Sequence, residues 1–202
     1  SVEVTTVLEA HVGNTVVPHT VIYTVHAGGA VDVKADFHAS EDFRLPRLAL
    51  QTMFSPSLEN VEWYGRGPIE NYRDRNAASF VGLYKSTVSD MREYYVRAQS
   101  MGGRTDTRWL SLTDDSGKGV RITADGTFDF SALHYTDPDL WRIKYGHDID
   151  LVRRAEVVLN LDCIQRGIGN ASCGPQPLPE YEIKSGTDYS YTFRIEPAGG
   201  IQ

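Results

Sequence analysis

Residues 61–75 of this 202-residue chain read Val61-Glu62-Trp63-Tyr64-Gly65-Arg66-Gly67-Pro68-Ile69-Glu70-Asn71-Tyr72-Arg73-Asp74-Arg75. The branched and aromatic side chains at the start of this stretch favour a β-strand. Gly65, Gly67 and Pro68 then predict a turn, because glycine allows positive φ or a close backbone approach and proline fixes one φ angle. The stretch therefore predicts a strand that breaks into a tight, charged corner.

Charged residues crowd together around this turn. Arginine presents a planar fork that matches the two oxygens of a carboxylate. We therefore expect Arg66, Arg73 or Arg75 to form ion pairs with Glu70 or Asp74. Because such networks are often structural, the favoured interpretation is a corner held by ion pairs.

The composition indicates one all-β domain. With 41% hydrophobic residues, a chain of 202 residues can bury one substantial core. Its 11 tyrosines, 18 glycines and 9 prolines fit many short strands joined by turns. A net charge of −7 and the lack of a Lys/Arg-rich tract argue against a nucleic-acid partner.

The chain contains no apolar run of the ~18–20 residues that a membrane span requires, so we expect a soluble protein without a membrane partner, cytoplasmic or periplasmic if bacterial. Because Ser1 begins inside β-like sequence without a signal pattern, the chain is interpreted as a processed product or an excised piece. Its two cysteines, Cys163 and Cys173, match no zinc site or disulfide framework. A single bridge between them is geometrically conceivable, but unpatterned cysteines favour free thiols.

Alternating apolar and polar residues indicate a β-meander followed by further strands. A helical turn is expected within 77–85, and a short helix is expected from a cap at Thr136 to about 143–145. Turn-forming residues predict hairpins at 13–14 and 114–117. The expected strands cover residues 1–10, 15–26, 31–38, 46–54, 94–96, 107–112, 119–124, 128–133, 153–161 and 189–195.

Adjacent acidic residues are the first candidates for catalysis. Retaining glycoside hydrolysis needs two carboxyl groups about 5–5.5 Å apart. Glu41 with Asp42, and Asp114 with Asp115, lie in turn-like stretches where acidic residues are ordinary caps. We interpret both pairs as surface residues.

The histidines suggest a second kind of site. His134 and His147 flank the expected short helix, with Asp139 and Asp148 nearby, so a metal site or an acid/base pair is conceivable. Their spacing matches no compact ligand motif, however. A hydrogen-bonded structural histidine is the favoured interpretation.

The best functional candidate is the loop formed by residues 167–179, which is rich in glycine and proline. Such a sequence precludes regular structure, and long ordered loops on a β scaffold are frequent binding sites. Asn170 and Ser172 offer donors and acceptors for sugar hydroxyl groups. The structural alternative is a proline-stiffened edge loop.

The corner resembles the signature of the C-terminal, small-chain domain (domain 5) of glycoside hydrolase family 2 β-galactosidases. The matching residues are Gly65, Arg66, Gly67, Pro68, Glu70, Asn71, Tyr72, Asp74 and Arg75. Further motifs of that domain follow in order, among them Gly103-Arg104-Thr105-Asp106, His134-Tyr135 and the run 167–175. The resemblance covers nearly the whole chain from Val61 onward.

The resemblance implies an all-β fold, a large antiparallel β-sandwich of the galactose-mutarotase-like supersandwich type. Residues 1–202 would form one such domain, lacking strands that family members carry upstream. The parent enzyme would hydrolyse terminal β-D-galactosyl bonds with retention. In the family both catalytic glutamates lie on a separate (β/α)₈ barrel, so we expect this chain to supply no catalytic residue.

The resemblance also implies that residues 167–179 complete the sugar-binding wall of the parent's active site. Asn170, Ser172, Cys173 and Gly174 are then the expected substrate contacts. Some relatives carry a tryptophan where Cys173 stands, and a cysteine offers no stacking surface. The Mg²⁺ and Na⁺ that the family uses would be bound outside this chain. The expected partners are the remaining domains of the parent, another subunit and the β-galactoside.

A second departure from the family lies within 97–104. Relatives usually carry Pro-Gln-Glu-Asn-Gly there, whereas this chain has Ala98, Ser100 and Met101 at the positions of the proline, acid and amide. Arg104 is retained. The hydrogen bonding of this segment is therefore expected to differ.

Two other functions stay open. A free-standing carbohydrate-binding module would expose an aromatic platform on one sheet, with Trp63, Trp109 and Trp141 as candidates. An aldose epimerase would pair a histidine with a glutamate in a central cleft, and the available residues are His134 or His147 with Glu180 or Glu182. A purely structural or subunit-contact role is compatible with the β-galactosidase interpretation.

Overall fold

The computed structural model describes residues 1–12, 15–39, 44–97, 99–143, 151–169 and 174–199. Within these ranges the regular structure is almost entirely antiparallel β-sheet, and none of the helices is long and apolar enough to span a bilayer. The strands are β1 Val2–Val12, β2 Thr15–Val25, β3 Val31–Ala39, β4 Arg47–Phe54, β5 Asn60–Gly67, β6 Phe80–Thr87, β7 Arg104–Thr113, β8 Gly119–Leu133, β9 Val157–Gln165 and β10 Thr187–Ala198. The helical elements are α1 Asp137–Arg142 and the 3₁₀ turns η1 Ser89–Met91 and η2 Pro179–Tyr181.

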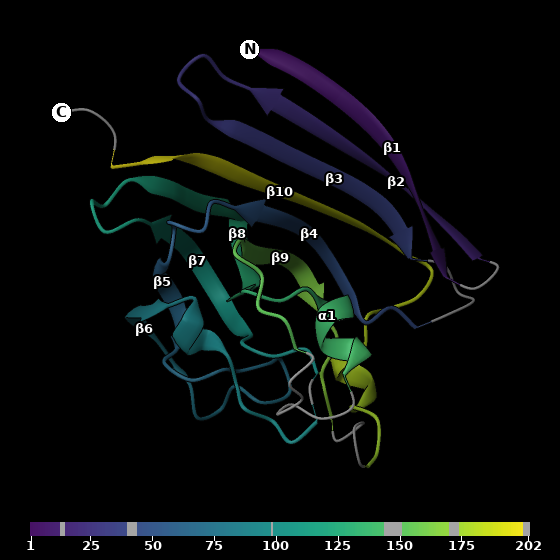
Figure 1. Ribbon diagram of the computed structural model, residues 1–202. Helices are drawn as coiled ribbons and strands as arrows, with labels where there is room; N and C mark the ends of the chain where they lie inside the picture. Colours follow the sequence, from purple (N-terminus) through teal and green to yellow (C-terminus); the bar gives the residue numbers. More distant parts are fainter. Residues whose placement is uncertain (13–14, 40–43, 98, 144–150, 170–173, 200–202) are drawn as a thin grey trace.

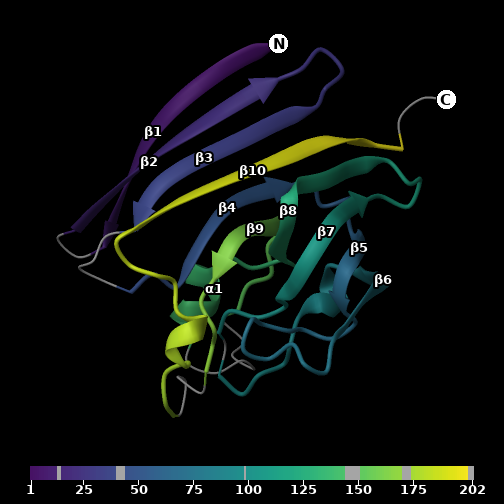
Figure 2. The same cartoon turned by 180° about the vertical axis from the view of Figure 1, so that it is seen from behind.

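The long strand β8 joins two parts of one continuous sheet. The main order is β1-β2-β3-β10-β8-β7-β5-β6, whereas β9 pairs with β8 and β4 pairs with β9. The first half of β8 pairs with β10, with Ala124 opposite Phe193. Its second half pairs with β9, with Leu133 opposite Val158. In Figures 1 and 2, β4 and β9 consequently lie beneath the layer formed by β1, β2, β3 and β10.

The core fills the space between these layers. Trp63, Phe130, Leu159 and Phe193 are among its fully buried side chains and come from four different strands. Leu50 of β4 packs against this cluster and also against the buried cluster under β2 and β3. Because burial of apolar surface is the main stabilising term in folding, two layers that share one core make a sandwich. The expected all-β sandwich is therefore confirmed.

Most of the predicted elements are present. The helix begins after its predicted cap, and the Asp114–Gly117 turn joins β7 to β8. The predicted helical turn within 77–85 is wrong, because residues 80–87 form β6 and pair with β5. The predicted strand at 94–96 is also wrong, because these residues are irregular. The predicted turn at 13–14 lies outside the described residues.

Strand β5 shows why the corner carries two glycines. The sequence predicts that the strand breaks at Gly65, but it continues through Gly67 before the cis peptide bond to Pro68. Val61, Trp63, Gly65 and Gly67 alternate toward the buried face. A Cβ on Gly65 would lie 2.9 Å from the Cα of Thr107. Gly65 thus allows a close approach of two backbones, and no positive φ is needed.

Replacement of this glycine tests the close approach. Gly65→Ala should lower the free energy of unfolding by ~1–3 kcal/mol, because the added methyl group overpacks a site bounded by backbone atoms. The control is Gly28→Ala, where an added Cβ would meet no atom within 4 Å. Urea unfolding followed by near-UV circular dichroism measures both. Equal stability of the two variants would contradict this packing argument.

Candidate functional site

A hollow of about 410 Å³ lies where the corner meets the beginning of the glycine-rich loop. One wall comes from the corner, through Glu70, Tyr72 and Arg75. The other walls come from Tyr95, Arg97, Gln99 and Ser100, from Trp141 of α1, and from residues 165–169 at the end of β9. Segments far apart in the sequence therefore form one concave surface, which is the usual form of a small-molecule site.

Asn71 holds the corner in place. Its side chain is fully buried, and its Oδ1 accepts hydrogen bonds from the backbone N–H of Thr105 at 3.0 Å and from the Thr105 hydroxyl at 2.6 Å. Its Nδ2 donates to the carbonyl of Ile69 at 3.0 Å, and its backbone N–H donates to the carbonyl of Gly103 at 2.9 Å. Because each buried polar group has a partner, the corner is fixed against β7.

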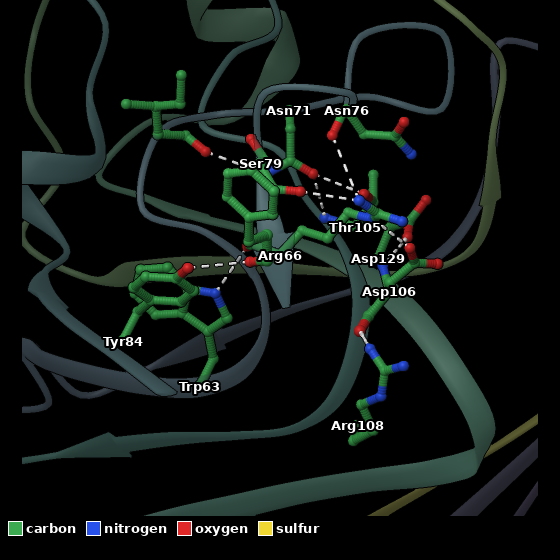
Figure 3. Close-up of polar contacts among 12 residues, drawn as sticks. Trp63, Arg66, Asn71, Asn76, Ser79, Tyr84, Thr105, Asp106, Arg108 and Asp129 are labelled. Carbon is green, nitrogen blue, oxygen red and sulfur yellow. Dashed lines mark hydrogen bonds and ion pairs between the residues drawn. The ribbon is translucent and has the colours of Figure 1, made fainter. Parts of the chain in front are cut away.

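Arg66 pairs with Asp106, a carboxylate outside the corner, and not with Glu70 or Asp74. Figure 3 shows its guanidinium between the segment 76–79 and Asp106. It pairs with the Asp106 carboxylate and donates to the carbonyl of Ser79 at 2.8 Å. The expectation that Arg66 pairs with Glu70 or Asp74 is therefore wrong. These two carboxylates accept hydrogen bonds from backbone N–H groups instead, at Gly102 for Glu70 and at the glycine-rich loop for Asp74.

Asp74 binds the beginning of the glycine-rich loop. Its two oxygens accept hydrogen bonds from the backbone N–H of Ile168 at 3.1 Å and of Gly169 at 2.7 Å. Arg75 donates to the carbonyl of Gly169. Gly169 has φ +53°, and an added Cβ would lie 2.7 Å from the nitrogen of Pro177, so this position requires glycine. The corner thereby fixes the direction in which the loop leaves the sheet.

The returning half of the loop is held from the same place. Arg166 donates to the side chain of Gln176, and its Nε lies 3.2 Å from a carboxylate oxygen of Glu182. The backbone N–H of Gly167 donates to the carbonyl of Tyr181 at 2.8 Å. Contacts on both stems therefore hold the two described ends of the loop beside the end of β9.

Glu70 is the carboxylate in the hollow's wall. It accepts hydrogen bonds from the backbone N–H of Gly102 at 2.8 Å and from the hydroxyl of Tyr72 at 3.1 Å. Burial raises the pKa of Glu70, although these two donors act in the opposite direction. Burial likewise raises the pKa of Tyr72, so its hydroxyl stays protonated and remains a donor.

The predicted substrate-binding residues are partly placed. Gly174 is exposed in the returning half of the loop. Asn170, Ser172 and Cys173 lie outside the described residues. Cys163 has a free thiol that is partly buried, and burial raises its pKa to about 11.

The other candidates for catalysis have structural partners. The Nε2 of His134 lies 2.9 Å from a carboxylate oxygen of Glu59, and its Nδ1 lies 3.0 Å from the carbonyl of Glu156. This histidine is structural, as expected, and is not paired with Glu180 or Glu182. Asp114 accepts hydrogen bonds from its own turn, which confirms its role as a cap. His147, Asp148, Glu41 and Asp42 lie outside the described residues.

The family described as "Beta galactosidase small chain" matches residues 1–195. The chain belongs to the β-galactosidase small-chain family. It is 29% identical over 192 residues to a β-galactosidase of Priestia megaterium, which aligns 94% of the chain and 18% of that protein. A β-galactosidase of Staphylococcus xylosus is 31% identical over 169 residues, with 82% of the chain and 16% of that protein aligned. One of Vibrio cholerae is 32% identical over 178 residues, with 86% and 16% aligned.

The chain thus spans less than a fifth of the length of each of these relatives. Its small-chain signature, from Gly65 to Arg75, forms one wall of the hollow and holds the loop. Sequence reasoning chose the loop and the signature but missed Tyr95, Arg97, Gln165 and Arg166 as wall residues. The one sequence feature that could have indicated these four wall residues is that they lie close to the recognised motifs in the sequence. Trp141 was named solely as a candidate platform.

Behind the corner, two carboxyl groups of neighbouring strands face each other, one almost completely buried (Asp162) and one partly buried (Asp129). Asp129 of β8 stands directly opposite Asp162 of β9. Burial and the charge of Asp162 raise the pKa of Asp129 to about 7, although the backbone N–H of Asp106 donates to it at 3.1 Å. Burial also raises the pKa of Asp162, which lies 3.0 Å from the Nε of Arg47.

The raised pKa of Asp129 predicts a pH-dependent stability. Between about pH 4 and 7 the unfolded carboxyl ionises while the folded one stays protonated, so this group makes the fold less stable as pH rises. Asp129→Asn removes that loss. Its free energy of unfolding relative to the wild type should therefore increase by roughly 2–4 kcal/mol as the pH rises from 4 to 8. Urea unfolding at several pH values measures this difference. Asp125→Asn, at an exposed position, is the control. If the stability difference between Asp129→Asn and the wild type does not change with pH, the raised pKa of Asp129 is contradicted.

Proposed function

We propose that the chain is a non-catalytic part of a retaining family 2 β-galactosidase that hydrolyses terminal β-D-galactosyl bonds. The support comes from the family match and from the relatives, each of which is named β-galactosidase. The sandwich would be of the galactose-mutarotase-like supersandwich type. The remaining domains of the parent would supply both catalytic carboxyl groups.

In this proposal the loop after Gly169 lines the sugar-binding side of the parent's active site. The observation that carries the proposal is the attachment of the loop: Asp74 accepts hydrogen bonds from the N–H groups of Ile168 and Gly169 beside a concave, hydrogen-bonding surface. Binding groups on loops are effective when a rigid scaffold fixes their stems. Asn170, Ser172, Cys173 and Gly174 would then meet the substrate.

The metals of the parent enzyme are proposed to bind elsewhere. Over the part of the chain that the structure describes, no three His, Cys, Asp or Glu side chains gather in an arrangement that holds a metal ion. In this proposal Mg²⁺ and Na⁺ belong to other domains of the parent. The expected protein partners are those domains and a second subunit.

Recombination of the chain with the rest of the enzyme tests the proposal. Alone, the purified chain should not turn over an aryl β-galactoside, because in this proposal other domains supply both catalytic carboxyl groups. Mixed with a parent that lacks residues 1–202, it should restore activity. The two components assayed separately are the controls, and circular dichroism checks that each is folded. Turnover by the chain alone would contradict the proposal, as would sugar binding without any effect on mixing, which indicates a free-standing binding module.

A further inference from the structure

Trp141 lies in the wall of the hollow with most of its side chain in water. It is 78% exposed, whereas Trp63 is 1% exposed in the core and Trp109 is covered by the guanidinium of Arg121, 4.1 Å from its ring centroid. Tryptophan is on average highly buried, because its ring is large and mostly apolar. An exposed tryptophan beside a concave site is therefore a candidate ligand contact.

The helix that carries Trp141 is closed at its N-terminus by a capping box. The hydroxyl of Thr136 accepts a hydrogen bond from the backbone N–H of Asp139 at 3.2 Å, and the carboxylate of Asp139 accepts one from the backbone N–H of Thr136 at 2.9 Å. Arg154 also donates to that carboxylate at 2.8 Å, and this pairing holds the pKa of Asp139 well below its usual range. The helix is thus held to the chain that precedes β9.

Two further contacts fix the helix against the sheet. Arg47 of β4 donates to the carboxylate of Asp137 at 2.9 Å. Leu140, the residue before Trp141, is almost completely buried in the core. The backbone of Trp141 is therefore held in place while its ring stays exposed, so binding a ligand there would require no ordering of the helix.

The rest of the hollow is suited to a sugar. Tyr95 provides a second aromatic side chain. The polar side chains that line the hollow are arginines and glutamines. Both are planar groups with several N–H donors, and the glutamines also have an acceptor oxygen. These residues are Arg75, Arg97, Gln99, Gln165 and Arg166. A pyranose has apolar C–H faces that pack on aromatic rings and an edge of hydroxyl groups that hydrogen-bond to such groups. The volume of about 410 Å³ also falls within the range of small-molecule sites, ~300–1,000 Å³.

We propose that Trp141 is the stacking platform for the leaving-group sugar of a β-galactoside. This inference rests on the proposed function, in which the hollow borders the active site of the parent. Cys173 offers no aromatic face to the substrate. Trp141 provides one from a different element, the helix α1, and so would determine which leaving groups the enzyme prefers.

The test compares two substrates in the full-length parent enzyme. Lactose has a glucose leaving group that covers an indole ring, whereas methyl β-D-galactoside leaves only methanol. Trp141→Ala should lower kcat/KM for lactose by roughly three- to tenfold, mainly through KM, and leave kcat/KM for the methyl galactoside unchanged. Trp141→Phe, which keeps a ring, should retain most of the activity on lactose. Because Trp141 is exposed, the thermal midpoint of both variants should match the wild type.

Tyr94→Ala is the matched control, because Tyr94 is 81% exposed and lies outside the wall of the hollow. It should leave both substrates unaffected. If the wild type hydrolyses both substrates and Trp141→Ala changes both equally or neither, the inference is overturned and the proposed function stands. A selective loss on lactose that also occurs in Tyr94→Ala would overturn it too. If the wild-type parent hydrolyses neither substrate, the proposed function itself fails.

Discussion

The carboxylate of Asp74 accepts hydrogen bonds from two consecutive backbone N–H groups, those of Ile168 and Gly169, and the arrangement of the site depends on this contact. It joins the corner after β5 to the chain after β9, which are more than 90 residues apart in sequence. Hydrogen bonds to a charged acceptor are stronger than neutral ones, and two of them on adjacent residues fix a direction as well as a position. This contact places two distant motifs side by side, and residues of both line the hollow.

Backbone hydrogen bonds and one buried amide position the corner itself. Its charged side chains, such as Arg66 and Asp74, contact other segments of the chain. Asn71 connects the corner to Thr105 of β7 and to Gly103 just before it. The side chain of Arg66 extends from the corner to Asp106 of β7, as Figure 3 shows. A buried amide whose oxygen and nitrogen both have hydrogen-bond partners specifies a geometry better than exposed ion pairs, which contribute little in water. The signature thus encodes a fixed bend from which Asp74 reaches the loop.

The sequence predicted what depends on local pattern. Alternation predicted most of the strands, and Thr136 with its following proline predicted the start of α1. The sequence prediction failed where pairing between strands determines the local structure. Residues 80–87 are a strand because they pair with β5, and the strand continues through Gly65, where Thr107 of β7 approaches closely. The loop was found from its glycines and prolines. The partner of Asp74 and the place of Trp141 in the wall depend on contacts between distant segments, which no local pattern shows.

The central claim is that Asp74 holds the beginning of the loop, and amide hydrogen exchange of Asp74→Ala tests it most directly. The account predicts that exchange at residues 168 and 169 becomes at least about tenfold faster, because these two N–H groups lose a charged acceptor, while the amides of β7 keep their protection. Unchanged exchange at residues 168 and 169 would contradict the account, since the beginning of the loop would then be held by something other than the corner.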